Sequence, residues 1–155
     1  MAKLFKKVLC PIDFDDNSIA ALHYARDLAI ENDATLYVMH VFFVPLASPG
    51  FPLEPYPVVS EEPSKLQLEK IAREHLKGTV RYELATRTGK PAEIINQAAE
   101  DFDVDLIVMA THGRTGVPHL FLGSVVEHVV RSSSRPVLTI RPEVGSAKKL
   151  SKRQS

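Results

Sequence analysis

The residues best suited to chemistry in this sequence lie between Asp105 and Ser124, in the stretch DLIVMATHGRTGVPHLFLGS. Thr111 and Gly113 follow an uninterrupted apolar run, and Gly123 stands at the start of a segment with helical character. A strand, a glycine loop and a helix start together suit an anion, because N–H groups at a helix N-terminus are unpaired and the helix dipole attracts negative charge. Glycines that only turn the chain explain the same spacing, so both interpretations stay open.

Few other residues form a pattern that is typical of a chemical site. Asp13 ends the first apolar run, where it is either a ligand-binding carboxylate or a turn residue. The six histidines lack the spacing of zinc ligands. Gly89 and Lys90 resemble half of a P-loop, but Pro91 stands where serine or threonine is needed. The sequence therefore predicts no catalytic centre.

Apolar periodicity predicts five strands that alternate with four helices. Continuous apolar runs are typical of strands buried on both faces of a parallel sheet, whereas the alternation in residues 80–85 predicts a half-exposed edge strand. The expected strands are 7–12, 35–44, 80–85, 106–109 and 136–140, and the expected helices are 18–31, 64–77, 91–102 and 124–133. This order predicts an α/β fold, an open, mostly parallel, Rossmann-like sheet with helices on both faces.

Capping residues and prolines mark the expected ends of these elements. Asp16, Asn17 or Ser18 is expected to cap the first helix, and Gly78 to end the second. Six of the eleven prolines fall within residues 45–63, which predicts a long irregular loop. Such a loop is either an excursion without function or a cover over a site.

Four residues carry a resemblance to a known family. Ala110, Gly113, Gly123 and Ser124 closely match the motif G-x2-G-x9-G-[ST], with alanine in place of the first glycine and nine residues between the other two. The chain resembles the nucleotide-binding branch of the universal stress protein family over roughly residues 4–142. The resemblance implies the strand order 3-2-1-4-5, and thereby a ligand crevice between the first and fourth strands.

The resemblance also implies a ligand and the residues that bind it. The ligand is ATP, with ADP and AMP as alternatives, accompanied by Mg²⁺ that keeps several waters and needs no protein ligand that we can name. Asp13 is expected near the ribose and adenine, the Val41 backbone at the adenine edge, and Arg114 either on the phosphates or exposed to solvent. The complete expected set is Pro11, Ile12, Asp13, Val41, Met109, Ala110, Thr111, Gly113, Arg114, Gly116, Gly123, Ser124 and Val125.

The last strand is expected to join two copies of the chain. An apolar edge strand offers unpaired backbone groups, and the resemblance implies antiparallel pairing of this strand across a two-fold axis. The expected interface is Val137, Leu138, Thr139, Ile140 and Arg141. The alternative is an edge that the basic tail shields.

Composition limits the classes of partner and compartment. The 19 basic and 19 acidic residues balance, so no nucleic-acid partner is expected, and no apolar run approaches the roughly 18 residues that span a membrane. A single cysteine, Cys10, excludes an internal disulfide, and we expect a cytoplasmic protein. One domain over residues 1–142 is expected, followed by a basic, disordered tail over 143–155.

The sequence leaves three hypotheses for function. The first is a homodimeric, ATP-binding module in the stress response, a slow ATPase at most. The second is a stress-protein homodimer that binds no nucleotide and acts only through protein contacts, which the methyl group of Ala110 favours. The third is an ATP-pyrophosphatase, which is disfavoured because residues 11–18, PIDFDDNS, lack the S-G-G-x-D-S loop of such enzymes.

Overall fold

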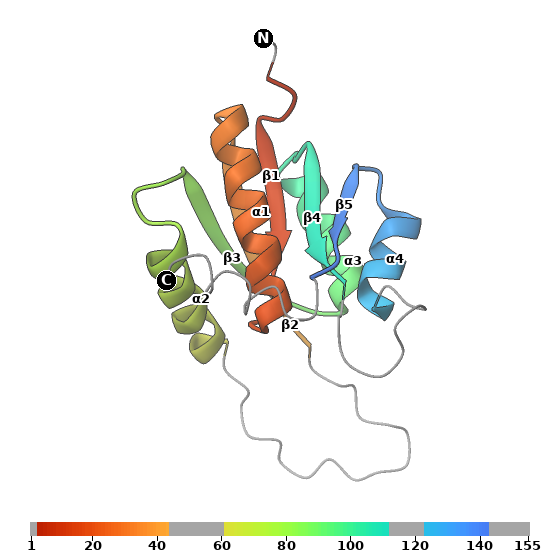
Figure 1. Ribbon diagram of the computed structural model, residues 1–155. Coiled ribbons are helices and arrows are strands. Elements are labelled where there is room, and N and C mark those ends of the chain that lie inside the picture. The colour runs from red at the N-terminus through yellow and green to blue at the C-terminus, as the bar shows by residue number, and fades with distance from the viewer. Residues whose placement is uncertain (1–2, 44–60, 112–122, 143–155) are drawn as a thin grey trace, which may run out of the picture.

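The computed structural model describes residues 3–43, 61–111 and 123–142 of the chain. Within these ranges strands and helices alternate (Figure 1), as the apolar periodicity predicts. The elements are β1 (Lys7–Pro11), α1 (Asp16–Asn32), β2 (Thr35–Phe42), α2 (Glu62–His75), β3 (Tyr82–Thr88), α3 (Pro91–Asp101), β4 (Leu106–Ala110), α4 (Ser124–Ser132) and β5 (Val137–Ile140).

The strands form one parallel sheet in the order β3-β2-β1-β4-β5. This confirms the predicted fold class and the predicted order, and it places β3 at an edge. The chain winds outward from β1 in one direction through β2 and β3, and in the other through β4 and β5. The connection that follows β1 leads toward β2, and the connection that follows β4 leads toward β5, in the opposite direction. This divergence opens a crevice beyond the carboxyl ends of β1 and β4.

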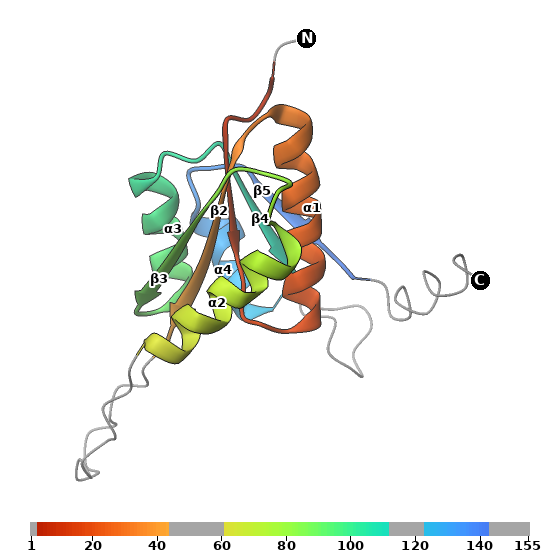
Figure 2. The same ribbon diagram turned by 90° about the vertical axis from the view of Figure 1, so that its left-hand side faces the viewer.

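Alternate residues of the central strands supply two cores, one on each face of the sheet. Val8 and Cys10 of β1 pack with α1 and α2, whereas Leu9 of β1 and Ile107 of β4 pack with α3 and α4. All four side chains are fully buried. Figure 2 shows α1 and α3 on opposite sides of the sheet. The uninterrupted apolar runs in β1 and β4 follow from this arrangement, because neither face of these strands meets water.

Three predicted helix ends, the start of α1 and both ends of α2, are wrong by two residues each. Asp15, not a later residue, caps α1, because its carboxylate accepts the amide hydrogen of Ser18 (2.7 Å). Helix α2 begins at Glu62, so the predicted loop over residues 45–63 ends earlier than expected; Pro63 fits the first turn of α2, where its missing N–H costs nothing. Gly78 does not cap α2; with φ of +76° it lies in the turn that follows. Residues 45–60 of the predicted loop lie outside the described residues.

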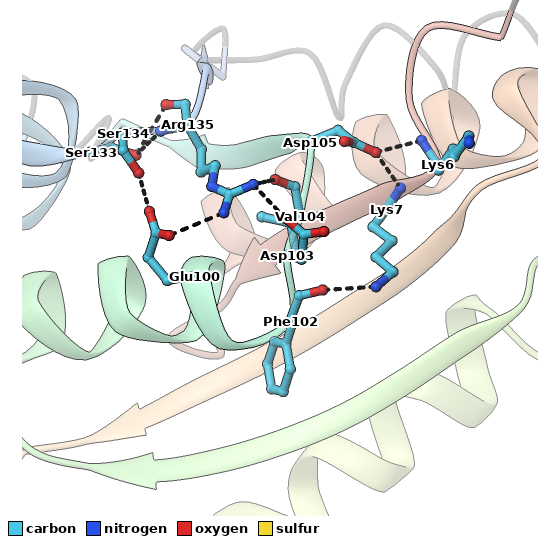
Figure 3. A network of polar contacts seen from close by, with 10 residues as sticks. All are labelled: Lys6, Lys7, Glu100, Phe102, Asp103, Val104, Asp105, Ser133, Ser134 and Arg135. Carbon is cyan, nitrogen blue, oxygen red and sulfur yellow. Dashed lines mark hydrogen bonds and ion pairs between the residues drawn. The ribbon is translucent and has the colours of Figure 1, made fainter.

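Polar contacts fix the amino ends of β1 and β4, far from the crevice. One carboxylate oxygen of Asp105 accepts the amide hydrogens of Lys6 (2.7 Å) and Lys7 (3.0 Å). The Lys7 ammonium group donates to the carbonyl oxygen of Phe102 (3.0 Å) (Figure 3). Asp105, which precedes the strand in sequence, is thus a residue that joins two neighbouring strands at their start.

Arg135 makes the corresponding contacts at the start of β5. Its guanidinium group donates to the carbonyl oxygen of Val104 (3.0 Å) and pairs with Asp103 (2.9 Å) and Glu100 (3.1 Å) (Figure 3). Hydrogen bonds from Arg135 and Ser134 hold the pKa of the Glu100 carboxyl below its usual value. Polar contacts therefore stabilise the amino ends of the strands, at the opposite end of the sheet from the crevice.

Two histidines face each other between α1 and α2. The Nε2 atom of His23 lies 2.9 Å from the Nδ1 atom of His75, and the ring centroids are 5.0 Å apart. Burial lowers the pKa of His23, and the charges of Arg26 and His75 lower it further.

We expect this lowered pKa to make folding less favourable in acid. The unfolded chain protonates His23 near its ordinary pKa, about 6.5, whereas the folded chain resists the proton, so stability falls as the pH drops below that value. Urea unfolding at pH 7 and pH 5 should show a smaller acid loss for His23→Asn than for the original chain. An equal loss in both proteins would show that another group dominates.

Cys10 is an inert thiol, and burial raises its pKa to about 12. Among the helices of the described residues, none combines the length and apolar character needed to cross a membrane.

Candidate functional site

A cavity of about 220 Å³ lies at the carboxyl ends of β1, β2 and β4. The N-terminal ends of α1, α3 and α4 complete its walls. Its described lining is Pro11, Ile12, Asp13, Asp15, Asn17, Ser18, His40, Val41, Pro91, Ile95, Met109, Ala110, Val125 and Val126. Most of the lining is apolar, and the polar side chains come from the turn between β1 and α1, from the first turn of α1 and from His40. The cavity occupies the crevice that the strand order creates.

The structure brings together more than half of the residues predicted from the sequence. These residues come from four segments that are far apart in the chain, and they meet only because β1, β2 and β4 are neighbours in the sheet. The predicted residues that line the cavity are Pro11, Ile12, Asp13, Val41, Met109, Ala110 and Val125.

Thr111, another predicted residue, is buried beside the cavity without lining it. Its amide hydrogen and its hydroxyl group both point to the carbonyl oxygen of Ile140, at 2.8 and 3.3 Å from the donor atoms. In this arrangement Thr111 extends the contact between β4 and β5. Gly113, Arg114 and Gly116 lie outside the described residues.

Gly123 and Ser124 stand at the start of α4, next to the cavity. Gly123 is the N-cap residue, and its carbonyl oxygen accepts the amide hydrogen of Glu127 (2.9 Å). Ser124 is exposed and lines a second hollow of about 330 Å³, which shares Pro91 and Val125 with the cavity. The first N–H groups of this nine-residue helix therefore lie beside residues that line both the cavity and the hollow.

Asp13 belongs both to the turn and to the cavity, so the two interpretations of this residue are compatible. Its carboxylate accepts a short hydrogen bond from the hydroxyl group of Ser18 and a longer one from the amide of Asp15 (3.3 Å). The hydroxyl oxygen of Ser18 in turn accepts the amide hydrogen of Asp13 (3.1 Å). These bonds hold the carboxylate in one place at the cavity wall.

His40 has a defined tautomer at the opposite side of the same turn. Its Nδ1 atom lies 2.8 Å from the carbonyl oxygen of Ile12, and because a carbonyl oxygen only accepts, Nδ1 carries the hydrogen. The ring also packs on that of Phe14, with centroids 4.3 Å apart. Both contacts fix the imidazole of His40 to the turn between β1 and α1.

Sequence reasoning missed half of the described lining: Asp15, Asn17, Ser18, His40, Pro91, Ile95 and Val126. A usable signal existed for some of them. In a parallel sheet every turn from a strand into the next helix lies at the carboxyl ends of the strands. Once the strands were placed, the first residues of α1 and α3 were therefore candidates for the lining of the cavity. Ile95 and Val126 have apolar side chains that are typical of the buried face of any helix, and no local signal distinguishes them from other core residues.

Comparisons with known proteins agree on one family. The family model described as "Universal stress protein family" matches residues 4–141. The chain is 35% identical to universal stress protein MJ0531 of Methanocaldococcus jannaschii over 89% of this chain and 83% of that protein. It is 36% identical to a universal stress protein of Thermus aquaticus over 89% of this chain and all of that protein.

Solved structures show the same fold. The structure of MJ0577 of Methanocaldococcus jannaschii has a TM-score of 0.71 and 25% identity, covering 91% of this chain and 99% of that one. A universal stress protein in complex with cAMP has a TM-score of 0.69 and 22% identity, covering 90% and 99%. One from Archaeoglobus fulgidus in complex with dAMP has a TM-score of 0.65 and 20% identity, covering 88% and 98%. Fold, cavity position and sequence matches lead to one conclusion: this chain belongs to the universal stress protein family.

Proposed function

We propose that this protein binds an adenine nucleotide, with Mg-ATP as the first candidate, in the cavity at the carboxyl ends of β1 and β4. It acts as a binding module in the stress response, in which the bound nucleotide changes its stability or its partners. The observation that supports this most directly is the meeting of seven expected nucleotide-binding residues from distant segments at one cavity. The cAMP and dAMP complexes of two proteins with the same fold support the ligand class.

The lining of the cavity favours a flat, largely apolar group such as adenine. Val41, Ile95 and Met109 contribute apolar side chains from three elements on one face of the sheet. The pairing of β2 with β1 ends at Met39, and the backbone N–H and C=O groups of Val41, two residues further on, suit the hydrogen-bonding edge of a purine. An apolar cleft with a few fixed polar groups is the usual form of a small-molecule site.

Charge determines which end of the nucleotide lies where. The Asp13 carboxylate at the cavity wall repels phosphate groups, so they must point away from it. The start of α4, with Gly123 and Ser124, offers the opposite environment: backbone N–H groups, a hydroxyl group and the positive end of a helix dipole. The base then lies in the cavity, the ribose passes Asp13, and the phosphates reach α4. Mg²⁺ fits this arrangement through the phosphates and water.

We expect hydrolysis of ATP to be slow or absent. Among the described residues, the groups that we propose to contact the phosphates are the first N–H groups of α4 and the Ser124 hydroxyl group, which bind negative charge but do not act as a general base. A binding role needs nothing more.

Native mass spectrometry of freshly purified protein tests the proposal directly. A carried-along adenine nucleotide, or an added mass after incubation with Mg-ATP, is the expected result. A protein that stays ligand-free at millimolar Mg-ATP would instead support the alternative in which the family member acts through protein contacts alone.

We further propose that the protein is a homodimer joined through β5. The sheet has two edges, and they differ in charge: β3 carries Glu83 and Arg87, whereas β5 carries no charged residue. Charges on an edge strand discourage pairing with another chain. Leu138, near the middle of β5, is 38% exposed despite its apolar side chain, so an uncharged edge with an exposed leucine is available for a second copy.

Hydrogen bonding identifies which groups of β5 are available to that copy. Amide hydrogens of Ile107 and Thr111 go to the carbonyl oxygens of Pro136 and Ile140, so the even-numbered residues of β5 face β4. The N–H and C=O groups of successive residues point to opposite sides of a strand. Those of Thr139 therefore point away from β4, outward from the sheet.

Replacing Thr139 by proline should convert the dimer to a folded monomer. The change removes an outward N–H group and leaves the ladder between β4 and β5 intact, because that N–H group takes no part in it. Size-exclusion chromatography with light scattering would report the mass, and circular dichroism the fold. Thr139→Val, which keeps the N–H group, is the control and should stay dimeric; a dimeric proline variant would place the interface elsewhere.

A cytoplasmic location and the roles of residues 45–60 and 143–155 stay predictions from the sequence.

A further inference from the structure

The turn between β1 and α1 has a backbone conformation that an aromatic residue rarely adopts. Phe14 has φ of +69°, in the left-handed region that favours glycine. Its ring packs on His40, which donates to the carbonyl oxygen of Ile12. A strained turn of this kind persists only where surrounding contacts determine it, and such turns are common at functional sites. Asp13 belongs to this turn and lines the cavity, so we ask which contacts hold its carboxylate in place.

Ser18 makes the contacts that hold Asp13. Ser18 as a whole residue is only 7% exposed. The hydroxyl oxygen accepts the amide hydrogen of Asp13 (3.1 Å) and the hydroxyl hydrogen goes to the Asp13 carboxylate in a short hydrogen bond. A hydroxyl group has one hydrogen to donate, so the Ser18 side chain is committed to Asp13. Helix capping, the ordinary role of a serine near a helix start, is performed by Asp15 instead.

The orientation of this carboxylate matters because an ionised carboxylate only accepts hydrogen bonds. A nucleotide offers it two kinds of donor: the amine of the base and the hydroxyl groups of the ribose. With the base among the apolar side chains and the phosphates at α4, the ribose hydroxyl groups are the donors at the cavity wall beside Asp13.

We propose that Ser18 is a positioning residue that sets the preference of the site for a ribose with free hydroxyl groups, acting through Asp13. The inference rests on the proposed nucleotide site and adds to it a sugar selectivity and the residue that controls it. Without the Ser18 hydroxyl group, the Asp13 carboxylate loses its short hydrogen bond and keeps only weaker restraints such as the longer bond from the Asp15 amide, so the ribose contact is weakened while the base contacts remain.

Titration calorimetry with Mg-ATP and with Mg-2′,3′-dideoxy-ATP measures this preference. The original protein should bind ATP roughly 10- to 100-fold more tightly than the dideoxy analogue, the range expected for hydrogen bonds to a charged group. Ser18→Ala and Asp13→Asn should each reduce the ratio to about 3-fold or less. In the Asp13→Asn background, adding Ser18→Ala should change the ratio by less than about 2-fold, because the two residues act as one unit.

Ser133→Ala is the matched control. The Ser133 hydroxyl group likewise contacts one residue twice, donating to the carbonyl oxygen of Arg135 (3.0 Å) and accepting its amide hydrogen (3.0 Å), but at the amino edge of the sheet. It should alter stability without altering the ratio. If Ser18→Ala fails to fold, Ser18→Cys replaces it, since a thiol is a weak donor of nearly the same shape and should also lower the ratio.

The outcomes separate this inference from the proposed function. A ratio near that of the original protein in a folded Ser18 variant, or no preference in the original protein, overturns the inference while nucleotide binding stands. A protein that binds neither ligand overturns the proposed function itself.

Discussion

Gly123→Val should weaken the binding of Mg-ATP by about 100-fold or more while leaving the dimer intact. A branched side chain at the N-cap of α4 would stand between the phosphates and the first N–H groups of the helix. Loss of two hydrogen bonds to a charged phosphate, at about 1.5 to 3 kcal/mol each, accounts for a loss of this size. Titration calorimetry gives the affinity, and light scattering the mass of the assembly.

Gly78→Val is the control for this experiment. A Cβ atom at Gly78 meets nothing within 4 Å, and the residue lies in the turn after α2, away from the cavity. Its φ of +76° makes valine unfavourable there, so the control should lose stability without losing affinity. Normal ATP binding by Gly123→Val would show that the phosphates do not lie at the start of α4.

Mg-ATP at 100 times its Kd should raise the melting temperature of the original protein by roughly 5 to 11 °C. A ligand at that concentration stabilises the folded state by about 2.7 kcal/mol. In a domain of this size, each kcal/mol raises the melting temperature by roughly 2 to 4 °C. Differential scanning calorimetry with increasing Mg-ATP measures the shift.

Magnesium and nucleotide added separately are the controls for that measurement. Mg²⁺ alone should have little effect, because the proposed ion binds through the phosphates rather than through protein ligands. No shift at millimolar Mg-ATP would favour a family member that acts only through protein contacts, with Ala110 at the cavity wall as the residue to test first.

Gly89, which follows β3, and Gly123, which precedes α4, show why a glycine in the sequence does not by itself predict a phosphate site. Gly89 precedes a lysine and thereby resembles part of a phosphate loop, but the structure gives it a packing role. Its φ is +148°, and an added Cβ atom would lie 2.7 Å from the Ile94 side chain. Gly123 instead stands beside the cavity at a helix start. Sequence spacing separates these cases only when the neighbouring elements are known.

Asp13 and Ser18 illustrate what local patterns miss. The sequence places both residues after the first strand, and each is a plausible helix cap. Only the folded turn assigns the cap to Asp15 and joins Ser18 to the Asp13 carboxylate. Propensity ranks these residues alike at a helix start and cannot choose among them, and no propensity predicts the left-handed backbone at Phe14 in the same turn.

The sequence by itself determined which segments are strands and helices, because hydrophobic periodicity is a local property of the chain. It also predicted that β4 is buried on both faces. The strand order was implied by the family resemblance, and the structure confirmed it. Only the tertiary structure decided that Pro91 and Ile95 of α3 share a cavity with Asp13 and Val41. Periodicity shows that a side chain is buried, but its neighbours depend on contacts between segments far apart in the chain.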